Sequence, residues 1–264
     1  MALELVSRSF GFRTREIWFS EVPFDVRHCS EVSFRECKKE IDIGGFTCSK
    51  FTTLVIDMES DLDVIWSGIK ANYRNEISRA RREGITVALN EGYDQFNLLN
   101  KDFREKKGLG NSPLDREAIE KHGTLFLAKY NGEAVVGQVY LRDEGNMRWV
   151  IGASKRLNSD KNLSKVIGFG NRLLVWEAIR FAKEKGVREF DMGGYYTGND
   201  ESDERHKINA FKKGFGGRIV THYNYQKCYS DLYRALRGLK RRFETLAGSL
   251  RIGRRSPLRR GALQ

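Results

Sequence analysis

The sequence predicts an α/β protein of the α+β kind, in which helices flank a mixed, mostly antiparallel sheet and a basic helix follows at the C-terminus. Three observations lead to this prediction. The 264 residues are 40% hydrophobic and 11% aromatic, enough to form a core. Segments with the alternation of strands and segments with helical spacing follow one another along the chain. Asn131-Gly132 between two alternating segments is a strong hairpin signal.

The first predicted elements form a small α/β group. Residues 52–58 are rich in β-branched side chains and predict a strand. Apolar residues at helical spacing then predict one helix over 62–80, which Gly84 closes. A strand over 85–89 and a helix over 94–107 follow.

The middle of the chain is expected to begin with a helix and to continue as a meander. Ser112 is placed to cap that helix, with Pro113 at its first position. Strands are predicted over 124–130 and 133–141 on either side of the Asn-Gly turn, and a third strand is predicted over 147–153.

The last part alternates between helices and strands. Apolar spacing predicts a long helix over 168–185, and a short strand over 188–192 comes next. A helix over 206–213 and a final strand over 218–225 complete the sheet. We therefore expect a smaller N-terminal unit over 1–110, a C-terminal unit over 111–228 and a basic amphipathic helix with a disordered tail over 229–264.

The positive charge is concentrated in the tail. Residues 232–264 contain ten basic residues and one acidic residue, a net +9 out of the +12 of the whole chain. Leucines and one phenylalanine between Leu232 and Leu250 recur every three or four residues, so a helix is expected there. Three interpretations stay open: docking of this helix on the body, contact with tRNA phosphates, and contact with an anionic membrane surface.

Several classes of protein are excluded by composition. No apolar run has the length of a membrane span, and the first thirty residues lack the apolar block of a secretory signal. We therefore expect a soluble, cytoplasmic protein, with peripheral binding at the inner membrane face as an open alternative. The four cysteines and four histidines show no metal-type spacing, so free thiols and no metal site are predicted.

Two glycine-containing motifs are candidates for binding and chemistry. Lys165, Gly168 and Gly170 precede the predicted long helix, where glycine amides and the helix N-terminus favour an anion. Alternatively, these glycines only relieve steric crowding. Asp191 at the end of a strand, followed by Gly193 and Gly194, suggests a carboxylate that orients or deprotonates an amine, beside amides that face an oxyanion. The alternative is a capping aspartate before a turn.

Two basic motifs complete the candidates. Phe211-Lys212 lies on a short predicted helix that ends in glycines, and this arrangement can hold an ammonium group in a cleft. Arg79 belongs to a run of arginines on the helix over 62–80, either as solvated surface or as a rim that attracts an anionic donor.

The order of these motifs resembles a known family. The Arg79-to-Gly84 helix end, Trp176 and Glu177 on the long helix, the Asp191-to-Gly194 motif and the Phe211-to-Gly217 motif follow one another as in the Fem-type (FemAB-like) branch of the GNAT acyltransferase superfamily. The resemblance covers about two-thirds of the chain. It implies tandem GNAT-like units that share a cleft and transfer an acyl group to an amine.

The resemblance also implies roles for single residues. Phe211-Lys212 matches the Phe-Lys pair whose lysine lies at the reacting ester, and Asp191 matches the acid before the glycine pair. Lys165 to Gly170 looks like a pyrophosphate loop, with Lys where Arg or Gln is commoner. The predicted co-substrate is acyl-CoA or aminoacyl-tRNA, with no permanently bound cofactor and an amine-bearing acceptor. The alternative is a non-catalytic RNA- or membrane-surface-binding protein on the same scaffold.

Overall fold

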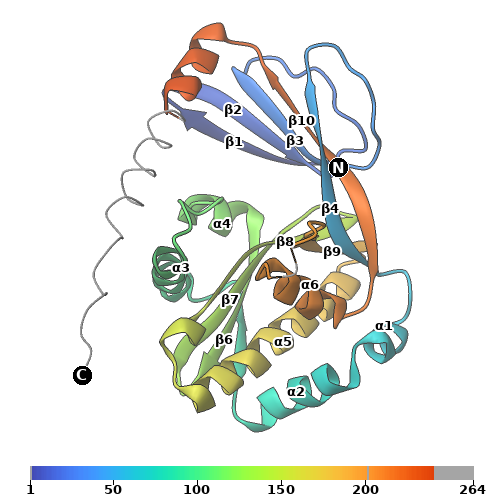
Figure 1. Cartoon of the computed structure of the whole chain (residues 1–264), viewed down its shortest axis with the longest axis vertical. Coiled ribbons are helices and arrows are strands. Elements are labelled where there is room, and N and C mark those ends of the chain that lie inside the picture. The colour runs from blue at the N-terminus through green and yellow to red at the C-terminus, as the bar shows by residue number, and fades with distance from the viewer. Residues whose placement is uncertain (1, 201, 241–264) are drawn as a thin grey trace, which may run out of the picture.

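The computed structural model describes residues 2–200 and 202–240, which form one ten-stranded sheet with helices on both faces (Figure 1). The strand order is β1-β2-β3-β10-β4-β9-β8-β7-β6-β5. Two neighbouring pairs, β2–β3 and β8–β9, are parallel, and the other neighbours are antiparallel. The predicted α/β class with a mixed, mostly antiparallel sheet is confirmed.

The bounds of the elements follow the chain. The strands are Leu3–Ser9 (β1), Phe12–Trp18 (β2), Glu31–Cys37 (β3), Thr47–Asp57 (β4), Thr86–Leu89 (β5), Gly123–Tyr130 (β6), Glu133–Arg142 (β7), Asn146–Ser154 (β8), Glu189–Gly194 (β9) and Arg218–Cys228 (β10). The helices are Leu62–Gly68 (α1), Ala71–Arg82 (α2), Tyr93–Lys107 (α3), Arg116–His122 (α4), Lys161–Glu184 (α5) and Arg205–Lys213 (α6), with a 3₁₀ turn over Lys155–Asn158 (η1).

The N-terminal strands are the largest departure from the sequence prediction, which began at residue 52. β1 to β3 extend the sheet beyond β10, and β10 lies between β3 and β4. The last strand therefore ties the end of the chain to its beginning. Strands from residues 1–110 and 111–228 alternate within one sheet, and the division at residue 110 stays a prediction.

The single helix predicted over 62–80 is wrong, because the chain forms two helices there. Ile69 is extended between α1 and α2, and the Lys70 amide donates to the Gly214 carbonyl at 2.9 Å. Ile69 and Tyr73 remain buried on either side of the break. The apolar spacing thus predicted the buried residues correctly. The helix breaks where the Lys70 amide donates to the carbonyl of a distant residue instead of to one within the helix.

The start of α5 is a second correction. The helix begins at Lys161 rather than at residue 168, and the Asp160 carboxylate caps it by accepting from the Asn162 and Leu163 amides. α4 likewise begins after Asp115, which accepts from the Ala118 amide, instead of after Ser112. In both cases an aspartate provides the cap at the first helical turn.

Helices cover opposite faces of the sheet. Phe126 and Ala128 of β6 belong to the core shared with α2 and α5. Leu125 and Leu127 of the same strand point the other way, into the core shared with α3 and α4. β8 and β9 therefore lie in the middle of a layered α/β region (Figure 1).

A helix over residues 231–240 follows β10 and packs against the N-terminal strands (Figure 1). The ring of buried Tyr233 lies 5.6 Å from the ring of Phe12. Leu232 and Leu239 of the predicted apolar stripe are exposed instead. The predicted tail from residue 241 onward lies outside the described residues. Within residues 2–200 and 202–240, no helix is both long enough and apolar enough to cross a membrane.

Candidate active site

The parallel pair β8–β9 ends early, and the candidate site lies at that end. Pairing stops at Arg148 and Asp191, although β8 continues to Ser154 and β9 to Gly194. A bulge between β7 and β8 lies just beyond Arg148. Space beyond the carboxyl ends of strands is where α/β folds place ligands.

Asp191 is a buried acceptor for several donors. Its side chain is 4% exposed, and the Thr53 hydroxyl donates to Oδ1. The Gly193 amide donates to the same oxygen at 2.5 Å, and Arg148 Nη1 lies 3.4 Å from Oδ2. Three elements of the sheet thus fix the orientation of this carboxylate.

Lys212 comes from α6 to the same end of β9. Its side chain is 7% exposed, and Nζ donates to the Gly194 carbonyl at 2.5 Å. Burial lowers the pKa of the Lys212 ammonium to about 8, while the nearby Asp191 carboxylate opposes this shift. The structure therefore brings together the two residues predicted to be catalytic.

Gly193 and Gly194 lie between these two side chains, inside β9 rather than in a turn. Gly193 has a φ of +79°, and an added Cβ would lie 3.1 Å from the Trp149 carbonyl oxygen and 3.7 Å from Lys212 Nζ. Only glycine suits this backbone. In the described structure the Gly193 amide is bonded to Asp191, and its expected role toward an oxyanion stays a prediction.

Phe211 joins an aromatic group beneath the site. Its ring lies 6.3 Å from Trp149, 6.0 Å from Tyr73 and 5.4 Å from Phe215. The Arg172 guanidinium lies 5.5 Å from the same ring. These contacts fix the position of α6, so Phe211 acts in the described structure as an anchor for its neighbour Lys212.

Arg79 lies apart from this group, at an exposed position of α2. Its Nε donates to Glu83 at 2.6 Å, and its guanidinium lies 5.0 Å from the Phe169 ring. No contact links Arg79 to Asp191 or Lys212 in the described part of the chain. The interpretation as surface is the one that its contacts favour.

The predicted pyrophosphate loop is wrong, because Lys165, Gly168 and Gly170 lie inside α5. Lys165 is exposed, and a Cβ added at Gly168 would make only an ordinary contact of 3.6 Å with Arg172 Nη1. Gly170 is buried where a Cβ would meet Ile85 and other apolar side chains at 3.5 Å or more. The glycines belong to a packed helix, as the alternative interpretation expected.

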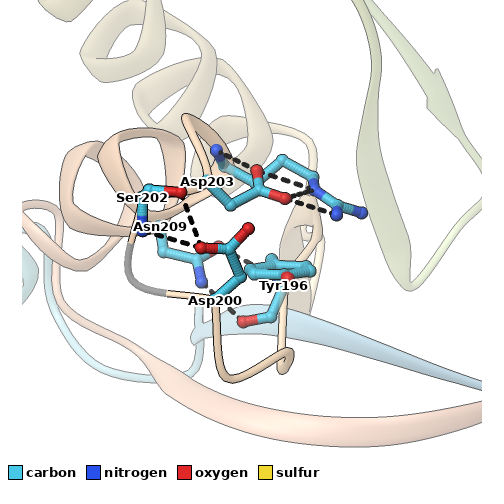
Figure 2. Close-up of polar contacts among 6 residues, drawn as sticks. Tyr196, Asp200, Ser202, Asp203 and Asn209 are labelled. Carbon is cyan, nitrogen blue, oxygen red and sulfur yellow. Dashed lines mark hydrogen bonds and ion pairs between the residues drawn. The ribbon is translucent and has the colours of Figure 1, made fainter.

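The segment between β9 and α6 is held by polar contacts (Figure 2). Asn209 accepts from the Tyr196 amide at 3.0 Å and donates to the Tyr196 carbonyl at 2.7 Å. The Arg205 guanidinium lies 3.8 Å from the Tyr196 ring and pairs with Asp203. These contacts fix the first turns of the helix that bears Lys212.

Sequence reasoning missed three residues of the site: Thr53, Arg148 and Glu36. Arg148 is 12% exposed and forms ion pairs with Asp191 and Glu36. Burial lowers its pKa, while Asp191 opposes this shift. The available signal was a charged residue inside an otherwise apolar strand, since such residues are rarely buried without a partner.

A cavity of about 410 Å³ opens beside Arg148 on the α4 side of the sheet. The Arg148 guanidinium lies 4.7 Å from the Phe51 ring and 5.5 Å from the Trp18 ring. Glu16, at the other side of the cavity, accepts from Trp18 Nε1 at 2.7 Å. The lining thus combines aromatic rings with carboxylates and guanidinium groups.

Glu36, Asp191 and His222 each bring one possible metal ligand within 4.8 Å of the others. Arg148 pairs with both carboxylates, so a protein cation already compensates their charge. Burial lowers the pKa of His222, and its Nδ1 has no hydrogen-bond partner among the described residues. The absence of a metal site stays a prediction.

A scan against protein-family models found no match, and a search of curated proteins found no relative. A search of solved structures found chains with a similar fold. FemX is 14% identical with a TM-score of 0.58, covering 89% of this chain and 90% of that chain. The C-terminal domain of a protein described as a lysylphosphatidylglycerol synthetase, from Agrobacterium fabrum, is 12% identical with a TM-score of 0.55 and coverages of 88% and 86%.

L-PGS from Bacillus licheniformis is 14% identical with a TM-score of 0.53, covering 91% of this chain and 85% of that chain. At such identities the similarity concerns the fold. It confirms the resemblance to Fem-type structures at that level.

Proposed function

We propose that the protein is a transferase that moves an acyl or aminoacyl group from a donor ester or thioester to an amine. The observation that carries this proposal is the meeting of Lys212 and Asp191 at one buried site, where β8 and β9 cease to pair. The fold shared with FemX and L-PGS supports it.

In the proposed reaction the amine nitrogen attacks the donor carbonyl carbon, a C–N bond forms, and the bond to the leaving oxygen or sulfur breaks. One proton passes from the amine to the leaving group. The tetrahedral intermediate carries a negative oxygen, and Lys212 is the cation assigned to it. A preorganised donor at such an oxygen contributes about 3–4 kcal/mol.

Asp191 is assigned to orientation. Its two oxygens already accept from Thr53 and Gly193 and face Arg148. These contacts hold the backbone of β9 beside Lys212 in one geometry. No serine or cysteine nucleophile is needed, since the donor is already an activated acyl group.

We assign the acceptor to the cavity beside Arg148. Trp18 and Phe51 provide apolar surface, while Glu16 and Glu36, which pair with Arg35 and Arg148, provide carboxylate oxygens that can accept hydrogen bonds from an amine. Arg148 borders both this cavity and Asp191, so an amine bound there lies next to the site.

An aminoacyl ester is the donor that we favour over acyl-CoA. The Asp160 carboxylate occupies the first amides of α5 and places a negative charge where a pyrophosphate would need positive charge. The A. fabrum neighbour is described as part of a lysylphosphatidylglycerol synthetase, and a lysyl group is an aminoacyl group.

The test supplies the full chain with total tRNA charged with labelled amino acids, or with labelled acyl-CoA, and with a cell extract of small amines. Mild base cleaves the donor ester or thioester and releases the free labelled acid, whereas amides survive. Label in a base-stable small molecule other than that free acid therefore reports transfer. We expect transfer from aminoacyl-tRNA and its loss in Lys212→Ala. Transfer from acyl-CoA alone contradicts the donor assignment.

The non-catalytic alternative makes a different prediction. A binding protein on this scaffold yields no base-stable product with either donor, and Lys212→Ala then changes nothing measurable. Transfer that persists unchanged in both Lys212→Ala and Asp191→Asn contradicts our assignment of the site.

A further inference from the structure

The turn between β1 and β2 presents an aromatic ring to solvent. Phe10 and Gly11 both have positive φ, +51° and +79°, and they connect the paired residues Ser9 and Phe12. Phe10 is 49% exposed. A two-residue hairpin loop requires positive φ at both central residues, and a bulky residue in this region is uncommon and costs backbone energy.

Two arginines flank this ring. Arg8 and Arg13 lie directly opposite each other across the hairpin, and both are exposed. Neither forms a side-chain hydrogen bond or ion pair with another described residue. Like charges at opposite positions of an antiparallel pair destabilise it. An external anion would turn this repulsion into a favourable contact.

The last described turn of the helix over 231–240 lies beside the same turn. Lys240 Nζ lies 5.8 Å from the Phe10 ring, and its neighbour Leu239 is 51% exposed. Arg237 pairs with Glu31, which holds the helix against β3. In the sequence, residues 241–264 then add seven basic residues and one acidic residue.

We propose that these side chains form a docking surface for an anionic phospholipid membrane. The tip surface, as we call it, wraps around the end of the hairpin: Arg8 and Arg13 lie on one face, Phe10 lies at the turn, and Leu239 and Lys240 belong to the helix that packs on the opposite face. Exposed apolar side chains among cations suit a lipid interface, where rings and aliphatic groups enter the headgroup region and cations face phosphates. Aliphatic Leu239 gains nothing from RNA phosphates, which decides for lipid. The proposal is independent of the proposed function.

The test measures sedimentation of the full chain with vesicles of phosphatidylcholine, alone or mixed with phosphatidylglycerol, at fixed ionic strength. We expect binding only to the mixed vesicles. Each cation near an anionic surface is worth about fivefold in affinity, so Arg8→Glu/Arg13→Glu should weaken binding by about 25-fold or more. The matched control Arg82→Glu/Lys101→Glu makes the same change in net charge on exposed helices and should bind almost normally.

The apolar part is tested with Phe10→Asn, because asparagine tolerates positive φ and keeps the turn folded. It should weaken binding several-fold, whereas Leu98→Ala on α3 should not. Equal losses in both charge-reversal pairs would overturn the proposal in favour of general attraction. Vesicle binding that neither Phe10→Asn nor Arg8→Glu/Arg13→Glu weakens would also overturn the proposal. So would a loss of binding to total tRNA in these variants while their binding to vesicles is unchanged.

Discussion

Lys212 and Arg148 are buried beside Asp191, whereas Arg8 and Arg13 stand in solvent opposite each other on the β1–β2 hairpin. In the first group, burial and a carboxylate determine the state of each cation. In the second group, neither arginine forms a hydrogen bond or ion pair with a described side chain, and only a longer-range attraction links Arg13 to Glu4. Buried cations suit short-range work on a reacting group, and exposed ones suit long-range attraction that salt screens.

Removal of the buried charges should have the largest effect of the changes considered, and this effect should be on the rate of transfer. We expect Lys212→Ala to lower the rate of transfer by about 100- to 1,000-fold, because an oxyanion loses its cation. Asp191→Asn should lower it by a smaller factor, since geometry is partly kept. Steady-state kinetics with the donor found in the transfer assay measures both.

Vesicle binding is the control for these variants. Neither Lys212→Ala nor Asp191→Asn should change vesicle binding, because both residues are buried and neither belongs to the tip surface. A parallel loss of transfer and vesicle binding would show that the two regions are not separate.

The stability of the protein at alkaline pH sharpens the comparison. The pKa of Lys212 is about 8 in the folded chain and 10.5 in its ordinary state. Between these values the unfolded chain binds more protons, so the free energy of unfolding rises with pH, by up to about 3 kcal/mol. Below pH 8 the buried charge lowers stability.

Lys212→Met should lack this rise and should be the more stable protein at pH 7. Urea denaturation of both proteins at several pH values between 7 and 10 measures the difference, which cancels other titrating groups. Identical pH profiles would mean that Lys212 is not buried as a charge.

Substitutions of two glycines should have the smallest effects, and the one at Gly168 tests the corrected bounds of α5. Gly193→Ala should destabilise by about 1–2 kcal/mol and impair transfer, because φ is positive and the Trp149 carbonyl lies 3.1 Å from the new Cβ. Gly168→Ala should stabilise by about 0.5–1 kcal/mol, because it lies in α5 and its new Cβ would make only an ordinary contact of 3.6 Å with Arg172 Nη1. Thermal unfolding measures both. A loss of transfer activity in Gly168→Ala would instead support the predicted role of this glycine in binding an anion.

Local signals explain how much of the fold could be predicted. Asn131-Gly132 defines its own turn, so the β6–β7 hairpin was predicted within a residue or so. The break at Lys70 could not be predicted, because its cause is the carbonyl of distant Gly214. β3 was missed, since it pairs with β10 at the far end of the chain. β1 and β2 were missed although they form a local hairpin, because Phe10-Gly11 is not one of the strong turn signals such as Asn-Gly.

The same distinction holds in the site. Asp191 and Lys212 were found because each belongs to a short motif with glycines. Arg148 and Glu36 were not, because their role arises from a pairing between β8, β9 and β3 that no local pattern encodes. The predicted start of α5 was wrong because it was placed at Gly168, among the glycines. The true start follows Asp160, whose capping carboxylate is an ordinary helix signal.

The most direct test of the central claim is a titration of the Lys212 side chain by heteronuclear NMR, in the native chain and in Asp191→Asn, with Lys212→Arg to assign the signal. Because burial lowers the Lys212 pKa and Asp191 raises it, the account predicts titration near 8 in the native chain and at lower pH in Asp191→Asn. An ordinary lysine pKa that is the same in both proteins would show that the two groups do not share a buried site.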